Sequence, residues 1–153
     1  MPKASVKRLI ECNKEQLIDL VLDIENYPKF IPYCLDAKIY EKKEEKNLIL
    51  IIADLTIGKG SFKATYKSDV RFNKDADIIK VTNIEGPLKH LNNKWVFLEK
   101  NNSTEIFFDI DFEIENKFLN IVMSKSFQYG LDKIADSFQK RAKDLFKNKL
   151  IKK

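Results

Sequence analysis

Hydrophobic and polar residues alternate along most of this chain, and this alternation predicts β-strands. In residues 62–72 apolar side chains occupy every second position, and the same period of two recurs in residues 104–114. A sheet built this way has one aromatic-rich apolar face and one face turned to water. Short, turn-rich links separate the runs, which indicates an antiparallel meander rather than β-α-β units. Strands are expected over residues 3–11, 36–43, 48–57, 62–72, 78–85, 90–99 and 104–114.

Two segments follow helical spacing instead. Asn13 is a favourable N-cap and Gln16 follows three positions later, so a helix is expected over about 14–25. Residues 117–148 contain no proline and carry apolar side chains at helical spacing, which predicts a helix on the order of 45 Å long. Such a helix could lie right across the apolar face of the sheet. Gly130 interrupts this helix and lowers its stability by about 1 kcal/mol relative to alanine. A glycine at this place predicts a kink in the helix or a close approach of another segment to it.

The segment Tyr27-Pro28-Lys29-Phe30-Ile31-Pro32-Tyr33-Cys34 links the first helix to the sheet. Proline lacks a backbone donor and biases the residue before it, here Tyr27 and Ile31, away from helix. We therefore expect a stiff corner that holds its aromatic rings in fixed places. Rings held in this way either fill a core or line an opening.

The composition is that of an ordinary globular protein, with 153 residues, 44% hydrophobic and 33% charged. This length suits a single domain over residues 1–153. No apolar run is long enough to span a bilayer, and the N-terminus lacks the apolar core of a signal peptide. Cys12 and Cys34 form no disulfide framework, which suits a reducing compartment. A cytoplasmic location is expected, with peripheral contact to the inner membrane as an option.

The positive charge is concentrated at the C-terminus. Residues 140–153 contain seven basic side chains and one acidic side chain, a net of +6, so the remainder of the chain is nearly neutral. One interpretation of this charge is that the cations interact favourably with the negative C-terminal end of the helix dipole. A docking surface for RNA or anionic lipid is the other, and no DNA partner is expected.

Catalytic and metal-binding patterns are missing from the sequence. His90 is the only histidine, and a lone histidine near a strand start is more often structural than part of a Ser-His-Asp or Cys-His arrangement. No spacing suggests a zinc site, and the four glycines form no phosphate loop. The carboxylates Asp109, Asp111 and Glu113 recur with a period of two, which places them on the solvated face. No catalytic residue, metal or required cofactor is expected.

A few polar side chains could point into the apolar face. Tyr66, Asn83 and Glu85 would then supply the small number of polar groups that small-molecule pockets usually carry. They could equally be polar residues near strand ends.

Several motifs resemble one protein family over nearly the whole chain. The corner 27–34 resembles the family's aromatic-Pro-x-Phe-Leu-Pro-Trp-Cys motif, and residues 86–91 with 95–97 resemble its Gly-Pro-Phe-x-x-Leu…Trp-x-Phe element. Residues 111–114 and 137–142, with Phe127 between them, resemble its Asp-Phe-Glu-Phe…Phe…Phe-x-x-Arg-Ala ending. The family is the coenzyme Q-binding, polyketide cyclase-like branch of the START-like (SRPBCC, helix-grip) superfamily, which includes the ribosome association toxins of the RatA type.

This chain departs from the family pattern at three places. Tyr33 stands where tryptophan is usual, and Leu88 stands where phenylalanine is common. Asn92-Asn93-Lys94 replaces a glycine-containing turn. The first two changes shrink rings beside the expected mouth of a cavity, so they bear on ligand identity.

The resemblance implies an α+β helix-grip fold, in which a curved seven-stranded antiparallel sheet wraps around a long C-terminal helix and leaves a deep hydrophobic cavity. It also implies non-enzymatic binding of a lipophilic ligand, typically ubiquinone, in support of respiratory electron transport. Tyr27, Phe30 and Ile31 would form a gate, and Tyr66 or Asn83 would bond a quinone carbonyl. The expected ligand-binding residues are Tyr27, Phe30, Ile31, Phe62, Tyr66, Asn83, Trp95, Phe97, Phe108, Phe127, Leu131 and Phe138.

Two other functions follow from the same resemblance. One is a toxin that binds the large ribosomal subunit through the basic C-terminal tail and blocks subunit association. The other is a polyketide cyclase-like enzyme, which needs an acid–base pair inside the pocket. Only Tyr66, Glu85 and His90 are candidates for that pair.

Overall fold

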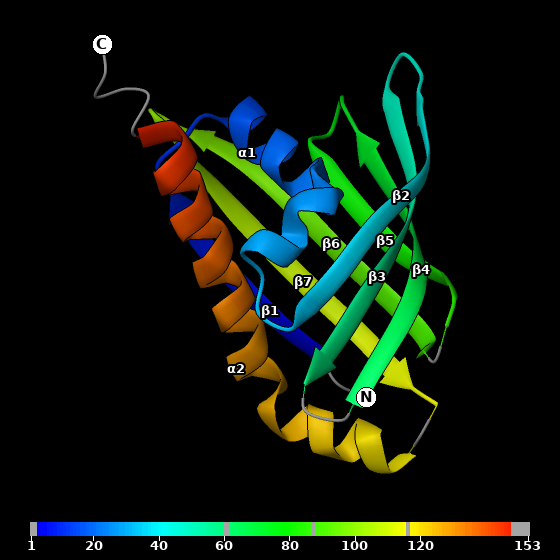
Figure 1. Cartoon of the computed structure of the whole chain (residues 1–153). Coiled ribbons are helices and arrows are strands. Elements are labelled where there is room, and N and C mark those ends of the chain that lie inside the picture. Colours follow the sequence, from blue (N-terminus) through cyan, green and yellow to red (C-terminus); the bar gives the residue numbers. More distant parts are fainter. Residues whose placement is uncertain (1–2, 60–61, 87, 116, 148–153) are drawn as a thin grey trace.

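Seven antiparallel strands form one curved sheet, and the helices lie on one side of it (Figure 1). The computed structural model describes residues 3–59, 62–86, 88–115 and 117–147, and within these it leaves out the side chains of 59, 62, 88, 114, 118–127 and 147. The strands are β1 (Lys3–Ile10), β2 (Cys34–Glu44), β3 (Leu48–Lys59), β4 (Phe62–Asn73), β5 (Ile78–Glu85), β6 (Leu88–Lys100) and β7 (Ser103–Ile114). The helical elements are α1 (Lys14–Leu22), the 3₁₀-helix η1 (Ile24–Lys29), α2 (Lys117–Ala142) and the π-helical turn η2 (Lys143–Lys147).

The strand order is β1-β7-β6-β5-β4-β3-β2, so six consecutive strands form a meander and β1 closes the sheet beside β7. Every neighbouring pair is antiparallel. This confirms the expected topology and the α+β helix-grip architecture.

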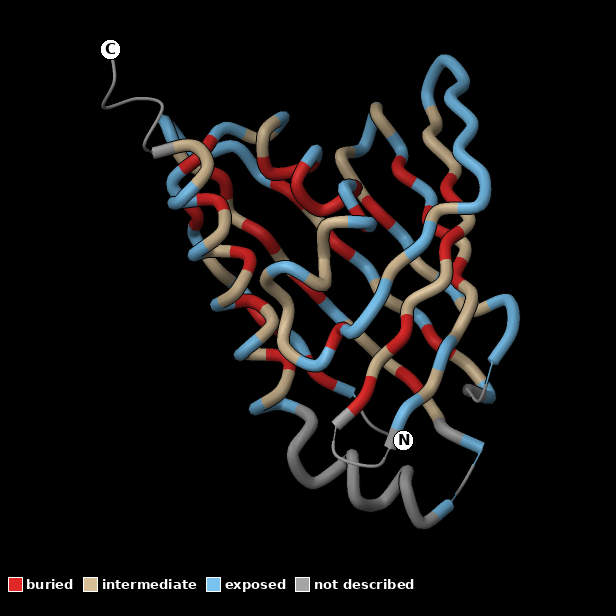
Figure 2. The backbone as a smooth tube through the Cα atoms, in the orientation of Figure 1, coloured by how far each residue is buried: buried red, intermediate tan, exposed pale blue. Residues whose placement is uncertain are grey.

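Burial alternates along the strands with the predicted period of two (Figure 2). Ser68, Val70 and Phe72 of β4 are buried, and Ile106 and Phe108 of β7 are buried in the same way. These side chains face the helices, and we refer to this side as the inner face. The side chains between them form the outer face.

The capping box that begins α1 is confirmed. The Asn13 side chain accepts a hydrogen bond from the Gln16 backbone N–H at 2.8 Å, and the Gln16 side chain accepts one from the Asn13 N–H at 3.2 Å. The helix ends at Leu22, three residues earlier than expected.

The expectation that the proline corner would leave the helical region at Tyr27 is wrong. Residues 24–29 form the 3₁₀-helix η1, with Pro28 inside it. The carbonyl of Tyr27 accepts hydrogen bonds from the N–H groups of Phe30 and Ile31, at 3.1 and 2.9 Å. Neither bond uses the nitrogen of Pro28, so the turn is held although proline has no N–H group to donate.

The long helix lies along the β1 edge of the sheet rather than right across it (Figure 1). The Gln128 and Gln139 side-chain amides donate to the β1 carbonyls of Ser5 and Leu9, at 3.0 and 3.4 Å. They thereby satisfy backbone acceptors at an open sheet edge. Arg8 of β1 adds ion pairs to α2, which reach Asp136 at 2.5 Å and Asp132 at 3.8 Å.

The end and the middle of the long helix differ from expectation. The α-helix ends at Ala142 and continues as the π-helical turn η2. A Cβ atom added at Gly130 would meet nothing within 4 Å, so the predicted close approach is wrong. Figure 1 shows α2 bending between its yellow first turns and its orange continuation. No helix in the described part of the chain is long and apolar enough to cross a membrane.

Residues 92–94 lie inside β6, within the strand expected over 90–99. They pair with β5 on one side and β7 on the other, so the glycine-containing turn of the family pattern has no counterpart here. Asn93 therefore occupies an inner-face position between Leu91 and Trp95.

Candidate functional site

The predicted ligand-binding residues divide into two groups on the inner face. The first group is closely packed around Phe138 of α2, and its aromatic rings contact one another. Trp95 stacks on Phe108 at 4.0 Å between ring centroids and meets Phe138 edge-on at 5.1 Å. The members that are at most 4% exposed are Trp95, Phe97, Phe108, Leu131 and Phe138. We call these five residues the packed cluster; their side chains are core in this structure.

The predicted gate residues contact this packed cluster. Tyr27, Phe30 and Ile31 are partly buried against it. The Tyr27 and Phe30 rings meet Phe138 edge-on at 5.6 and 5.2 Å. The Tyr27 hydroxyl also donates to the carbonyl of Val21, which ties η1 to α1. Burial raises the pKa of Tyr27, so this donor stays protonated.

Outside these contacts the corner exposes apolar surface. Tyr33 adopts a positive φ of 65° and leaves its side chain 55% exposed. Leu35 follows at the start of β2 and is similarly exposed. The corner therefore contributes rings to the core through Tyr27 and Phe30 and presents apolar side chains to solvent through Tyr33 and Leu35.

A second, smaller cluster occupies the other end of the inner face. Leu91 and Phe112 are buried there, and Tyr66, Val81 and Ile110 pack against them while remaining partly exposed. We call these five residues the distal cluster. Val81 and Ile110 also pack against the larger core cluster, so the two clusters are continuous on the inner face.

The polar candidates of the inner face differ in their partners. The Asn83 side-chain oxygen accepts a hydrogen bond from the Leu91 N–H at 2.8 Å, where the β5–β6 pairing ends. Tyr66 belongs to the distal cluster, and burial raises the pKa of its hydroxyl, which therefore stays a protonated donor. Glu85 is exposed and lies 4.0 Å from Lys67.

Gly86 lies directly against the backbone of Tyr66. The glycine has a φ of +132°, and a Cβ atom added there would lie 2.8 Å from the Cβ of Tyr66. Only glycine allows the backbone to approach Tyr66 this closely in that conformation. The predicted sites at Phe62 and Phe127 lie outside the residues whose side chains are described.

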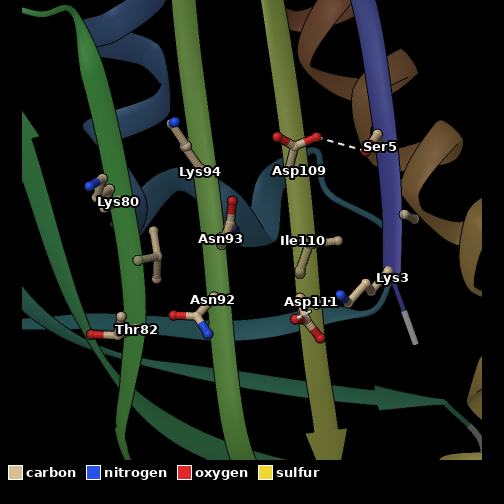
Figure 3. A pocket seen from close by; sticks show the side chains of 12 residues that line it. Lys3, Ser5, Lys80, Thr82, Asn92, Asn93, Lys94, Asp109, Ile110 and Asp111 are labelled. Atoms are coloured by element: carbon tan, nitrogen blue, oxygen red, sulfur yellow. Dashed lines mark hydrogen bonds and ion pairs between the residues drawn. The ribbon is translucent and has the colours of Figure 1, made fainter. Parts of the chain in front are cut away.

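The outer face carries the charged residues, as predicted. Asp109 accepts a hydrogen bond from Ser5 at 2.7 Å, and Asp111 lies 4.0 Å from Lys3. The His90 ring bonds Asp111 at 3.1 Å, which gives the lone histidine a structural partner. A groove of about 590 Å³ crosses β5, β6, β7 and β1 here (Figure 3). Its lining is mainly lysine, aspartate, threonine and asparagine, with Ala4, Val81 and Ile110 between them, so it is not the apolar cavity that the fold class implies.

Sequence reasoning missed part of the inner face. Val81, Leu91, Ile110 and Phe112 of the distal cluster were not among the predicted site residues, and neither was Asn93. The signal for Asn93 was its inner-face parity with Leu91 and Trp95 within the expected strand 90–99.

A curved antiparallel sheet that holds a long C-terminal helix, with a mainly apolar inner face, defines a START-like protein. The comparisons with known proteins agree. Residues 10–139 match the family described as polyketide cyclase / dehydrase and lipid transport, and the chain belongs to this family.

Two curated relatives carry different names. The ribosome association toxin RatA of Rickettsia prowazekii is 29% identical over 144 residues, which span 92% of this chain and 95% of the toxin. The mitochondrial coenzyme Q-binding protein COQ10 of Dictyostelium discoideum is 30% identical over 134 residues, which span 86% of this chain and 64% of that protein.

Solved structures agree on the fold. An 18 kDa protein of Caulobacter crescentus superimposes with a TM-score of 0.78 at 27% identity, covering 95% of this chain and 98% of the other. The ZhuI aromatase/cyclase of Streptomyces superimposes with a TM-score of 0.76 at 11% identity, covering 92% and 93%. At that identity the second likeness concerns the fold alone.

Proposed function

We propose that this protein binds a lipophilic small molecule, without catalysis, on the inner face between sheet and helices. The ligand we propose is an isoprenoid quinone such as ubiquinone, held in support of respiratory electron transport. The observation that carries the proposal is the distal cluster, where Tyr66, Val81 and Ile110 face inward yet remain partly exposed. The family membership and the coenzyme Q-binding relative support the same class of ligand.

The two halves of the inner face have different parts in this proposal. The packed cluster is closed by ring contacts, so it forms the floor of the site. The ligand occupies the distal half, where each Å² of isoprenoid surface removed from water contributes about 25 cal/mol. Phe30 and Ile31 remain the gate residues of the proposal, with Tyr27 as their fixed anchor.

Two measurements test this proposal. The protein is purified from its native membrane context, extracted with organic solvent and analysed by mass spectrometry for quinones. Added decylubiquinone is then titrated while the fluorescence of Trp95, the single tryptophan, is followed. Quinone in the extract and saturable quenching are expected. The proposal is overturned when neither bound quinone nor binding of added quinone is found.

Ribosome binding is the second candidate function, and the RatA relative favours it. The structure exposes Lys140 and Lys143 at the end of α2, while Lys149, Lys152 and Lys153 lie outside the described residues. Binding to RNA phosphates releases counterions, so co-sedimentation with large ribosomal subunits should weaken steeply as salt rises. Charge reversal at Lys140 and Lys143 should weaken it further.

Charge reversal at Lys42 and Lys46, two exposed lysines on the β2–β3 hairpin, is the matched control and should have little effect. Co-sedimentation that is absent, or that does not respond to salt, would exclude the ribosomal candidate.

A cyclase function receives little support from the arrangement of the candidate residues. Tyr66 faces inward, whereas Glu85 is exposed beside Lys67 and His90 bonds Asp111 on the outer face. The three groups therefore do not form an acid–base pair in one pocket.

A further inference from the structure

Three buried side-chain atoms in the described part of the chain have no hydrogen-bond partner: Ser68 Oγ, Asn93 Oδ1 and Arg141 Nε. Two of them, on Ser68 and Asn93, belong to the inner face of the sheet. Native proteins satisfy the large majority of buried polar side-chain atoms, so each exception needs a physical explanation, such as a bound molecule.

Asn93 lies next to residues of the distal cluster. Its register partners are Val81 on β5 and Ile110 on β7, and Leu91 precedes it by two positions on β6. All three of these neighbours belong to the distal cluster. Asn93 itself is partly exposed, whereas its Oδ1 is enclosed. A side-chain amide has both donors and an acceptor to offer there.

Ser68 lies on the same face and on the same strand as Tyr66, two positions away. It is 1% exposed, and its register partner across β4–β5 is Asn83. Asn83 accepts a hydrogen bond from the Leu91 N–H, and no hydrogen bond joins its side chain to Ser68 Oγ. A serine hydroxyl both donates and accepts, which suits an oxygen atom of a bound molecule.

The chemistry around these two groups restricts the ligand class. The described inner-face residues of this region are apolar or neutral polar, with no lysine or arginine among them: Tyr66, Ser68, Val81, Asn83, Leu91, Asn93, Ile110 and Phe112. A carboxylate buried here would lack a compensating cation, which strongly disfavours a fatty-acid head. A neutral ring with oxygen substituents matches the hydroxyl and amide groups.

We infer that Ser68 and Asn93 form the polar recognition point for a neutral, oxygen-bearing ring of the bound ligand. This inference rests on the proposed function, because it assigns the head-group end of the same site. The apolar remainder of the ligand then lies against the distal cluster.

The test compares decylubiquinone with decylbenzene, which has the same alkyl chain but no oxygen on its ring. Affinities of both compounds are measured for the wild type, Ser68→Ala and Asn93→Ala. Each substitution is expected to lower the affinity for decylubiquinone about fivefold relative to the affinity for decylbenzene. This is the effect of losing one hydrogen bond of typical net strength. Asn92→Ala is the matched control, since Asn92 is the exposed neighbour on the outer face, and should leave the ratio unchanged.

The outcomes separate this inference from the proposed function. If the wild type binds neither compound, the proposed function fails. If it binds decylubiquinone and both variants keep the wild-type ratio of affinities, the recognition point is overturned while the proposed function stands. Thermal unfolding accompanies each titration, and loss of the orphaned groups should not lower stability. Should Asn93→Ala fail to fold, the ratio of the two affinities measured for Ser68→Ala decides whether the recognition point stands.

Discussion

Phe138 is the side chain at which three elements of this protein meet. Tyr27 and Phe30 of the η1 corner and Trp95 of β6 all contact its ring edge-on, at centroid distances of 5.6, 5.2 and 5.1 Å. Phe138→Ala removes these contacts and leaves a cavity, so it should lower the free energy of unfolding by about 3–5 kcal/mol. Urea denaturation measures this change.

Tyr129→Ala, on the same helix, is the control for Phe138→Ala. The Tyr129 side chain is 66% exposed, so its loss should change stability by less than about 0.5 kcal/mol. An equally small effect at Phe138 would show that the corner and α2 are not joined through this ring.

The two buried cysteines give the stability a defined pH dependence. Burial raises the pKa of the Cys12 and Cys34 thiols from the ordinary 9.0 to about 11. Between these values the unfolded chain loses protons that the folded chain keeps, so stability is complete below pH 9 and falls as pH rises toward 11. Each thiol contributes a slope of up to about 1.4 kcal/mol per pH unit.

Chemical denaturation between pH 8 and 11 measures that slope. The Cys12→Ala variant should show a shallower decline than the wild type, because one of the two thiols with a raised pKa is removed. Some decline should remain, because Cys34 and the tyrosines titrate in both proteins. Identical slopes would mean that the Cys12 thiol is not held protonated by burial.

At the scale of elements, two glycines that look alike in the sequence have opposite roles. Gly130 lies inside α2 with open space around it, so Gly130→Ala should stabilise the protein by about 1 kcal/mol through helix propensity. Gly86 has a φ of +132° and lies against Tyr66. Gly86→Ala should therefore destabilise the protein, through backbone strain and a clash of the added Cβ with Tyr66. Melting temperatures of the two variants should move in opposite directions. A shift in the same direction would contradict the roles assigned to one of these glycines.

Most elements could be predicted because their evidence is local. The period of two in β4 and β7 and the capping box at Asn13 are each contained in a short stretch of sequence. The 3₁₀-helix around Pro28 could not be predicted in this way, since its hydrogen bonds use the Tyr27 carbonyl rather than the proline nitrogen. Packing of α2 along β1 depends on Gln128 and Gln139 reaching backbone carbonyls more than a hundred residues away in sequence.

At the scale of the whole molecule, the inner face carries two clusters of apolar side chains, which meet at Val81 and Ile110. The sequence identified aromatic residues of the inner face but could not tell which of them contact one another. Trp95 and Phe108 were predicted as site residues, and the structure stacks them in the core at 4.0 Å. Asn93 was missed, although it lies only two positions from Trp95 on the same strand.

This arrangement makes one prediction that involves both clusters. Val81 faces inward from β5 and is partly exposed within the distal cluster, where the proposal places the ligand. Val81→Phe should lower the affinity for decylubiquinone at least tenfold, because it occupies the space proposed for the ligand, while the melting temperature is kept or raised. Trp95 fluorescence and thermal unfolding measure the two effects on the same samples.

Thr82→Phe is the matched control for Val81→Phe, because Thr82 follows Val81 on β5 and is exposed on the outer face. It adds the same ring to the same strand without entering the inner face, so quinone affinity should stay at the wild-type level. If Val81→Phe binds decylubiquinone as tightly as Thr82→Phe does, the ligand does not occupy the distal half. If Val81→Phe instead unfolds the protein, that half is already as tightly filled as the cluster around Phe138.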